Sequence, residues 1–146
     1  MDLKNMGYTE KRKLAEDTNT PEDILRELAK DEYQVVRVQI ANNPNCPIDI
    51  LRKLAKDKDF WIRAHVANNP YTPEDALLNL ATDEKEAVRY RVAKNPTNSS
   101  KILVMLFEYE KNLREPNKYV IQALYANANL PHIAKVIIET LFREML

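Results

Sequence analysis

Apolar residues recur along this chain with a period of 26 residues, and each period holds two stripes with helical spacing. The three copies without gaps span residues 19–44, 45–70 and 71–96. In the earliest copy the stripes are Ile24, Leu25, Leu28 and Ala29, then Val36, Ile40 and Ala41. Positions three and four residues apart share one face of an α-helix, so each copy is predicted to be a pair of helices.

The residues between the stripes predict where the helices begin and end. The first helix is expected to begin at Thr20-Pro21, with threonine as the N-cap and proline as the first helical residue. The second is expected to begin at Asp31, which heads a capping-box sequence with Gln34. It ends before Asn43-Pro44, because proline cannot continue a helix. The recurring Asn-Pro sequence is therefore interpreted as the joint between repeats and not as a ligand motif.

The remaining segments are variants of the same unit. Residues 97–128 form a fourth repeat with six extra residues, and residues 129–146 supply only a capping first helix. Residues 11–18 align with 37–44, which makes 1–18 an N-terminal half-repeat cap. The last helix is rich in apolar side chains, so it either seals the end of the array or contacts a partner; we favour sealing.

A single 26-residue unit holds only five large apolar side chains, too few to offset the entropy lost on ordering the chain. Neighbouring units must therefore stack on one another, which is the physical basis of a solenoid. The predicted fold is all-α, an α-solenoid of about five helix-pair repeats with a period of 26.

The consensus of the repeats resembles a known family. Leu77, Leu80, Ala81 and Asp83, followed by Val88, Arg89, Val92, Ala93, Asn95 and Pro96, carry the pattern of the leucine-rich repeat variant family. The Asp-to-Arg spacing is also similar to HEAT-type repeats. The resemblance implies a right-handed superhelix. Some family members carry a cysteine cluster for an iron–sulfur centre, but this chain has one cysteine, Cys46, so no cofactor is expected.

Comparison of the three clean repeats separates the second helix into two faces. Five columns stay nearly fixed: Val36/Ile62/Val88, Arg37/Arg63/Arg89, Ile40/Val66/Val92, Ala41/Ala67/Ala93 and Asn43/Asn69/Asn95. Four columns vary: Val35/Trp61/Ala87, Val38/Ala64/Tyr90, Gln39/His65/Arg91 and Asn42/Asn68/Lys94. At about 100° per residue, the two sets lie on opposite sides of the helix. The fixed side is expected to stack and the variable side to face outward.

The variable side holds residue types that are enriched at binding hot spots. The predicted binding stripe consists of Trp61, His65, Asn68, Tyr90, Arg91, Lys94, Tyr119 and Gln122. By the family resemblance, this layer of helices lines the concave surface. The alternative is that Trp61 and Tyr90 fill irregular gaps between repeats.

Two other features have a structural and a functional interpretation. The arginine column could line a phosphate groove, but an ion-pair ladder with the aspartates of adjacent repeats explains both columns, and we favour the ladder. Cys46 replaces the threonine of other repeats. A helix N-terminus lowers the pKa of a thiol, yet a tolerated substitution at a cap is the simpler interpretation.

Composition narrows the functional classes. Lys and Arg total 22 and Asp and Glu total 22, so no large net charge attracts nucleic acid or a membrane. The two histidines, His65 and His132, have no acid or nucleophile at a telling spacing, so neither a metal nor an enzyme is predicted. The first residues lack the apolar stretch of a signal peptide, and the expected location is the cytoplasm.

The predicted function is therefore a non-catalytic adaptor that binds a protein or peptide along the variable face of the second helices. Arg91 and Lys94 would favour acidic groups in that partner. The alternative is a nucleic-acid-binding helical-repeat protein, in which the same aromatic and basic residues contact a phosphate backbone. No membrane partner is expected.

Overall fold

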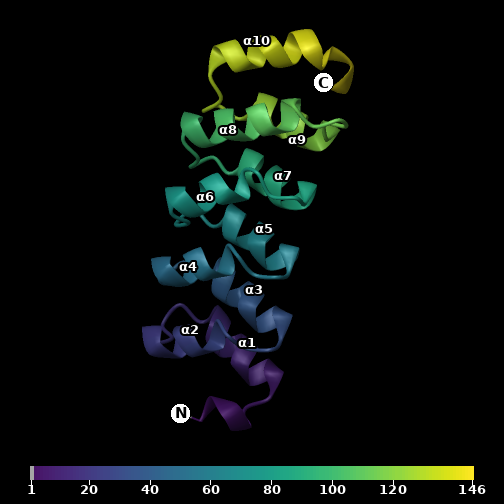
Figure 1. Ribbon diagram of the computed structural model, residues 1–146. Coiled ribbons are helices and arrows are strands. Elements are labelled where there is room, and N and C mark those ends of the chain that lie inside the picture. The colour runs from purple at the N-terminus through teal and green to yellow at the C-terminus, as the bar shows by residue number, and fades with distance from the viewer. Residues whose placement is uncertain (1) are drawn as a thin grey trace.

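The structure is a computed structural model that describes residues 2–146 (Figure 1). These residues form ten α-helices and two short 3₁₀ turns, and they contain no strand. The elements are η1 (Leu3–Asn5), α1 (Tyr8–Glu16), α2 (Glu22–Leu28), α3 (Gln34–Asn42), α4 (Ile48–Leu54), α5 (Phe60–Asn68), α6 (Glu74–Leu80), α7 (Glu86–Lys94), α8 (Ser100–Lys111), α9 (Lys118–Ala126), α10 (His132–Leu141) and η2 (Arg143–Met145). The prediction of an all-α chain is confirmed.

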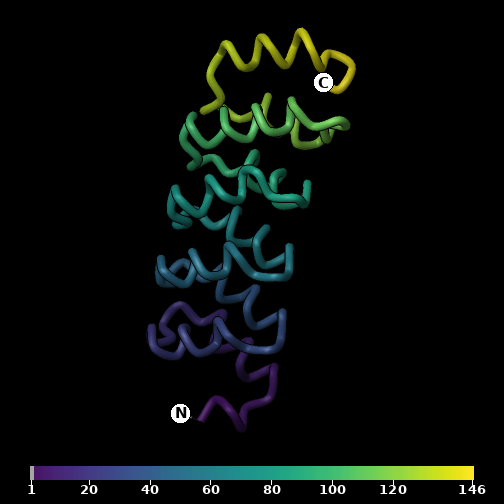
Figure 2. Tube along the Cα trace, in the orientation of Figure 1, coloured from purple at the N-terminus to yellow at the C-terminus, as the bar shows by residue number. Residues whose placement is uncertain are grey.

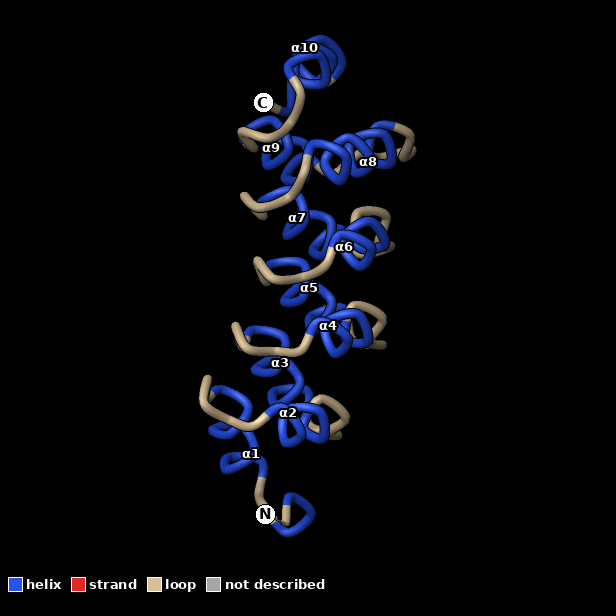
Figure 3. The backbone as a smooth tube through the Cα atoms, turned by 90° about the vertical axis from the view of Figure 1, so that its left-hand side faces the viewer, coloured by secondary structure: helices blue, strands red, loops and turns tan. Residues whose placement is uncertain are grey.

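The helices stand in two parallel columns, as the trace in Figure 2 and the turned view in Figure 3 show. One column holds the odd-numbered helices α1 to α9, which we call the second helices. The other holds the even-numbered helices α2 to α10, which we call the first helices. Each second helix packs on the next one, α1 on α3, α3 on α5, α5 on α7 and α7 on α9. This arrangement is consistent with stacked helical repeats.

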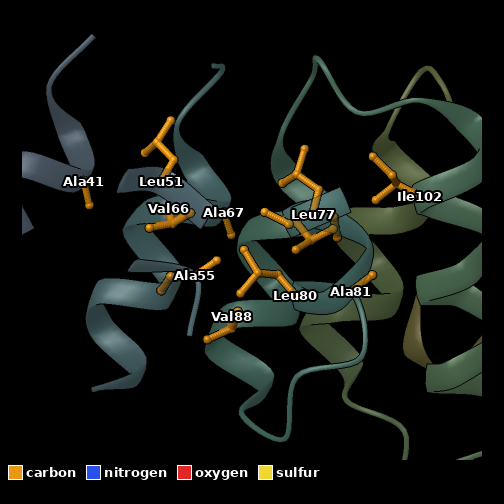
Figure 4. Packing of buried hydrophobic residues seen from close by; sticks show 14 of the residues in the cluster. Ala41, Leu51, Ala55, Val66, Ala67, Leu77, Leu80, Ala81, Val88 and Ile102 are labelled. Atoms are coloured by element: carbon orange, nitrogen blue, oxygen red, sulfur yellow. The ribbon is translucent and has the colours of Figure 1, made fainter. Parts of the chain in front are cut away.

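The fixed columns of the second helices form the centre of the core. Ala41, Ala67 and Ala93 have no exposed surface, and the small side chain lets successive second helices approach closely. The aliphatic columns around them are also fully buried, and they meet Leu51, Leu77 and other leucines of the first helices (Figure 4). The columns that stay constant in the sequence are thus the ones that every repeat needs for packing.

The predicted start of the first helices is wrong by one residue. Proline occupies the N-cap itself at Pro21 and Pro73, and no side chain caps these helices. The threonine before each proline instead donates backward: Thr72 Oγ1 is 2.6 Å from the carbonyl oxygen of Val66. Thr20 makes the same bond to Leu14. The buried hydroxyl satisfies a carbonyl at the end of the preceding second helix.

The predicted start of the second helices is also wrong, because they begin at Gln34, Phe60 and Glu86. The aspartates at 31, 57 and 83 are not capping-box residues. Each carboxylate accepts a hydrogen bond from the backbone N–H two residues later, as Asp83 does from Lys85. This geometry is an Asx turn, which leads the chain into the helix. The carboxylate can still accept hydrogen bonds from a second residue.

That second partner is the arginine of the preceding repeat. Arg37 pairs with Asp57 at 2.9 Å, and Arg63 pairs with Asp83 at 2.7 Å. Lys11 pairs with Asp31 at the N-terminal end. The arginine side chains also donate to backbone carbonyls in their own repeat, as Arg63 does to Asp57. The predicted ion-pair ladder is confirmed. The guanidinium groups of this column are engaged in ion pairs and hydrogen bonds within the chain.

The fourth repeat keeps the ladder by a different route. Its first helix, α8, extends to Lys111, so the aspartate turn of the other repeats is absent. Glu110 takes the place of the aspartate: its Oε2 lies 2.7 Å from Arg89 Nε, and its Oε1 accepts from the backbone N–H of Asn117. Glu110 has no exposed surface. The inserted residues therefore lengthen α8 and bury a charged pair.

A second ladder consists of buried asparagines at the ends of the second helices. The Nδ2 of Asn69 donates to the carbonyl of Ala41, one repeat earlier, at 2.7 Å. Asn95 donates to Ala67 and Asn127 to Ala93 in the same way. Helix C-termini leave carbonyls without a partner, and each asparagine satisfies one in the neighbouring repeat. The asparagine thus ties successive repeats together.

The helix α10 and the turn η2 form the C-terminal end of the array. At the C-terminal end, α10 buries Ala134 and Ile138 but leaves Ile133, Val136 and Leu141 exposed. Its outer side is therefore apolar, and its role in sealing the array stays a prediction. The turn η2 folds back on α9, where Gln122 Nε2 donates to the carbonyl of Met145.

Candidate binding face on the second helices

The variable columns of the second helices form one outward surface, which we call the second-helix face. It comprises Val35, Val38, Gln39, Asn42, Trp61, His65, Asn68, Ala87, Tyr90, Arg91 and Lys94 on α3, α5 and α7. All of these side chains are exposed or partly exposed, whereas Ala64, in the same columns, is buried. The sequence separation into a packing side and an outward side thus corresponds to a separation in burial.

The two aromatic residues of the predicted stripe differ in how they are held. Trp61 is 47% exposed, and its ring stacks on Phe60 with centroids 5.4 Å apart. Tyr90 is partly buried and packs against the hydrophobic core. Part of the Tyr90 side chain therefore fills space between repeats, as the alternative interpretation expects, whereas the Trp61 indole is exposed. An exposed, braced tryptophan suits an anchor for a partner.

Polar side chains beside Trp61 are linked across neighbouring helices. His65 Nδ1 lies 3.0 Å from Asn42 Oδ1 on α3, and its ring lies 6.3 Å from that of Trp61. Partial burial and the nearby Arg91 guanidinium lower the pKa of His65 below its ordinary value. The lowered pKa favours the neutral imidazole, and the contact with Asn42 orients the ring beside the indole.

The face is basic at α7. Neither Arg91 nor Lys94 forms an ion pair with a carboxylate in residues 2–146, although most arginines of the chain do. The Lys94 ammonium lies 6.0 Å from the Tyr90 ring centroid. These two cations are free to meet an acidic group on a partner.

Beside Lys94 the face has a hollow of about 330 Å³ between α7 and α9. Its walls are mainly alanines, at positions 93, 123, 126 and 128, with Pro96 and Asn127. Ala123 and Ala126 occupy the columns that hold Arg91 and Lys94 one repeat earlier. The fourth repeat thus has alanines where the preceding repeat has Arg91 and Lys94, and the hollow can take an apolar side chain.

The last two predicted residues lie on α9. Tyr119 is 67% exposed and continues the column of Trp61. Gln122 is partly buried and bonded to the C-terminal turn, so its amide is already engaged. The structure thus brings seven of the eight predicted residues to exposed or partly exposed positions on one side of the second helices, whereas the amide of Gln122 is hydrogen-bonded within the chain.

The sequence reasoning missed the contribution of α1 and of the small residues. Lys13 is exposed on α1 at the position of Gln39, His65 and Arg91, so it extends the basic side of the face. The alignment of 11–18 with 37–44 carries that signal. The alanine hollow could not be predicted, because small side chains in a variable column leave a hollow only in combination with the side chains around them.

Cys46 is not a reactive thiol in this structure. It is 6% exposed, and burial raises the pKa of its thiol to about 12. A helix N-terminus would lower the pKa of this thiol, but desolvation of the thiolate raises it by more. Cys46 fills the buried position of Thr20 and Thr72.

We expect iodoacetamide to alkylate Cys46 at least about 100-fold more slowly in the folded protein than in urea, because the nucleophile is the thiolate. Mass spectrometry of timed samples at pH 8 measures both rates. Equal rates in the folded and unfolded protein would contradict the buried position of the thiol.

Residues 2–146 bring together no group of three His, Cys, Asp or Glu side chains suited to a metal ion. Among these residues, every helix is too short or too polar to span a lipid bilayer.

The fold and the face define an all-helical repeat protein. The family model described as leucine rich repeat variant matches residues 60–85, which include α5 and α6. The resemblance to this family of HEAT-like helical repeats is confirmed over that segment. No curated protein and no solved structure matches the chain.

Proposed function

We propose that this protein is a non-catalytic adaptor that binds a protein or peptide segment along the second-helix face. The observation that carries the proposal is Trp61, a large aromatic side chain that is 47% exposed on a surface where packing requires no tryptophan. Its column holds valine in the preceding repeat and alanine in the next, so the array stacks without an aromatic there.

The chemistry of the face favours a partner with acidic groups. Arg91 and Lys94 lie beside each other without internal carboxylates, and Lys13 adds a third exposed cation on the same side. The alanine hollow beside Lys94 can take an apolar side chain next to the acidic group. Desolvated aromatic and apolar contacts would provide most of the affinity, and the cations would provide preference.

The proposal includes the architecture inferred from the sequence. We infer a right-handed solenoid of about five helix pairs, with 1–18 as a half-repeat cap, repeats at 19–44, 45–70, 71–96 and 97–128, and 129–146 as the capping segment. The close packing of second helices on one another supports placing them on the concave side. A concave face lets one extended partner contact several repeats.

The test compares Trp61→Ala with Tyr71→Ala in affinity capture from the native cell. Tyr71 is 59% exposed but lies in the loop after α5, outside the second-helix face, so it is the matched control. We expect Trp61→Ala to weaken capture of a partner about tenfold or more and Tyr71→Ala to leave it unchanged. Thermal melting followed by circular dichroism should be the same for both variants and the wild type.

Two outcomes would contradict the adaptor function. Unfolding of Trp61→Ala would place the indole in the core. Steeply salt-dependent binding in a mobility-shift assay with single- or double-stranded nucleic acid would favour the alternative, because release of counterions from phosphates produces that dependence.

A further inference from the structure

The half of the second-helix face that lies on α3 and α5 carries no formally charged side chain. Its exposed and partly exposed residues are Val35, Val38, Gln39, Asn42, Trp61, His65 and Asn68. Partial burial and the Arg91 guanidinium lower the pKa of His65, which favours its neutral form. Charged residues make up 30% of the chain, so this neutral surface differs from the rest of the molecule. It suits a partner segment that is itself uncharged.

One column of the face presents an apolar side chain on each successive second helix. Val35 on α3 is 37% exposed, Trp61 on α5 is 47% exposed, and Ala87 on α7 is partly exposed. Figure 3 shows α3, α5 and α7 stacked one above another. Helices that pack on one another lie about 8–10 Å apart, so the column repeats along the array at about that distance. A partner that follows the column must present a side chain to it at each such step.

A polyproline II helix has a repeat of this length, because it advances about 9.3 Å in each turn of three residues. A β-strand returns to the same face after about 6.6 Å, so its side chains do not match the column. Proline-rich segments bind exposed aromatic rings, and their conformation is formed before binding, which reduces the entropy that they lose. Trp61 is such a ring at the centre of the neutral half.

The amide side chains of the face suit a backbone that has free carbonyls. Asn42 Oδ1 lies 3.0 Å from His65 Nδ1. An amide oxygen can only accept, so Nδ1 is the donor and the NH₂ group of Asn42 is left to donate to a partner. Gln39 and Asn68 place further amides on the same face. A polyproline II helix makes no internal hydrogen bonds and its prolines lack an N–H, so it offers acceptors alone, whereas an α-helix uses its carbonyls internally.

We propose that the second-helix face binds a proline-rich segment in the polyproline II conformation. Its prolines lie on α3 and α5, along the column of Val35 and Trp61, and an acidic residue at one end meets Arg91 and Lys94 on α7. The change from a neutral to a basic surface between α5 and α7 sets this order of residues in the partner. The inference rests on the proposed adaptor function and names the class of its partner.

The test uses Trp61, the single tryptophan of the chain, as a fluorescent reporter. The probe is a synthetic peptide of nine prolines followed by two aspartates, and a second probe with the aspartates first covers the opposite chain direction. In the control peptide, alternating glycines and serines replace the prolines. We expect the better proline probe to change Trp61 fluorescence with a dissociation constant of about 0.1 mM. The control should bind about tenfold more weakly or less, because a flexible chain loses more entropy on binding.

Two variants of the protein test the contacts. Asn42→Asp should weaken the proline probe about fivefold, because a carboxylate cannot donate to a carbonyl. Asn79→Asp, the same change at an exposed position of the first helix α6, should leave affinity unchanged. Lys94→Gln should weaken the probe with aspartates about threefold and leave the binding of nine prolines alone unchanged. Circular dichroism checks that each variant keeps its helical content.

Equal binding of the proline and glycine–serine peptides, or no fluorescence change at about 1 mM proline probe, would overturn the inference. It would also be overturned if a single-stranded oligonucleotide changed the fluorescence and the proline probes did not. The adaptor function is tested separately: loss of partner capture by Trp61→Ala, together with no proline binding, would keep that function and assign it a partner of another class. Proline binding without an effect of Trp61→Ala on capture would contradict the adaptor function alone.

Discussion

Glu110→Ala is expected to lower the free energy of unfolding by about 3–5 kcal/mol, because it leaves the buried Arg89 guanidinium without its counter-ion. The Glu110 side chain is 0% exposed and that of Arg89 is 6% exposed, so water cannot replace the carboxylate. The backbone N–H of Asn117, at the start of α9, loses its acceptor as well. Urea denaturation followed by circular dichroism measures the change.

The control for this substitution is Glu74→Ala. Glu74 pairs with Lys101 between α6 and α8, but the two side chains are 54% and 68% exposed. Water screens such a pair, so its loss should change the free energy of unfolding by less than about 1 kcal/mol. Equal effects of the two substitutions would show that the Arg89–Glu110 pair is solvated in solution.

Asn69→Ala is expected to destabilise the protein by about 2–4 kcal/mol, because a buried carbonyl and a partly buried backbone N–H lose their partners. The amide Nδ2 donates to the Ala41 carbonyl, and Oδ1 accepts from the backbone N–H of Tyr71 at 2.9 Å. The first bond joins one repeat to the preceding one, so its loss should also lower the cooperativity with which the repeats unfold. Urea denaturation should show a lower midpoint and a broader transition.

Asn68→Ala is the matched control, since Asn68 precedes Asn69 but is exposed on the second-helix face. Alanine has a higher helix propensity than asparagine, and we expect a change of less than about 0.5 kcal/mol. If Asn68→Ala were as destabilising as Asn69→Ala, the effect would lie in the end of α5 and not in the bond between repeats.

Much of the candidate site was accessible from the sequence because repeats can be compared with one another. Positions that must stack are constrained, so Val88, Arg89 and Ala93 recur, whereas Tyr90 and Arg91 beside them do not. The degree of exposure was not accessible, since Trp61 and Tyr90 share the variable face but only Trp61 stands largely open. Burial of each side chain depends on how closely the neighbouring helices approach it, and that distance is set by the tertiary structure.

The period, the all-helical class, the two faces of the second helices and the ion-pair ladder could all be predicted from the sequence, because each follows from side-chain chemistry that recurs at fixed spacing. The acceptors of the Thr72 and Asn69 hydrogen bonds, the replacement of an aspartate by Glu110 and the hollow beside Ala126 could be found only in the folded chain. These features arise from contacts between residues far apart in the chain, and their partners are fixed only when one repeat is set against the next.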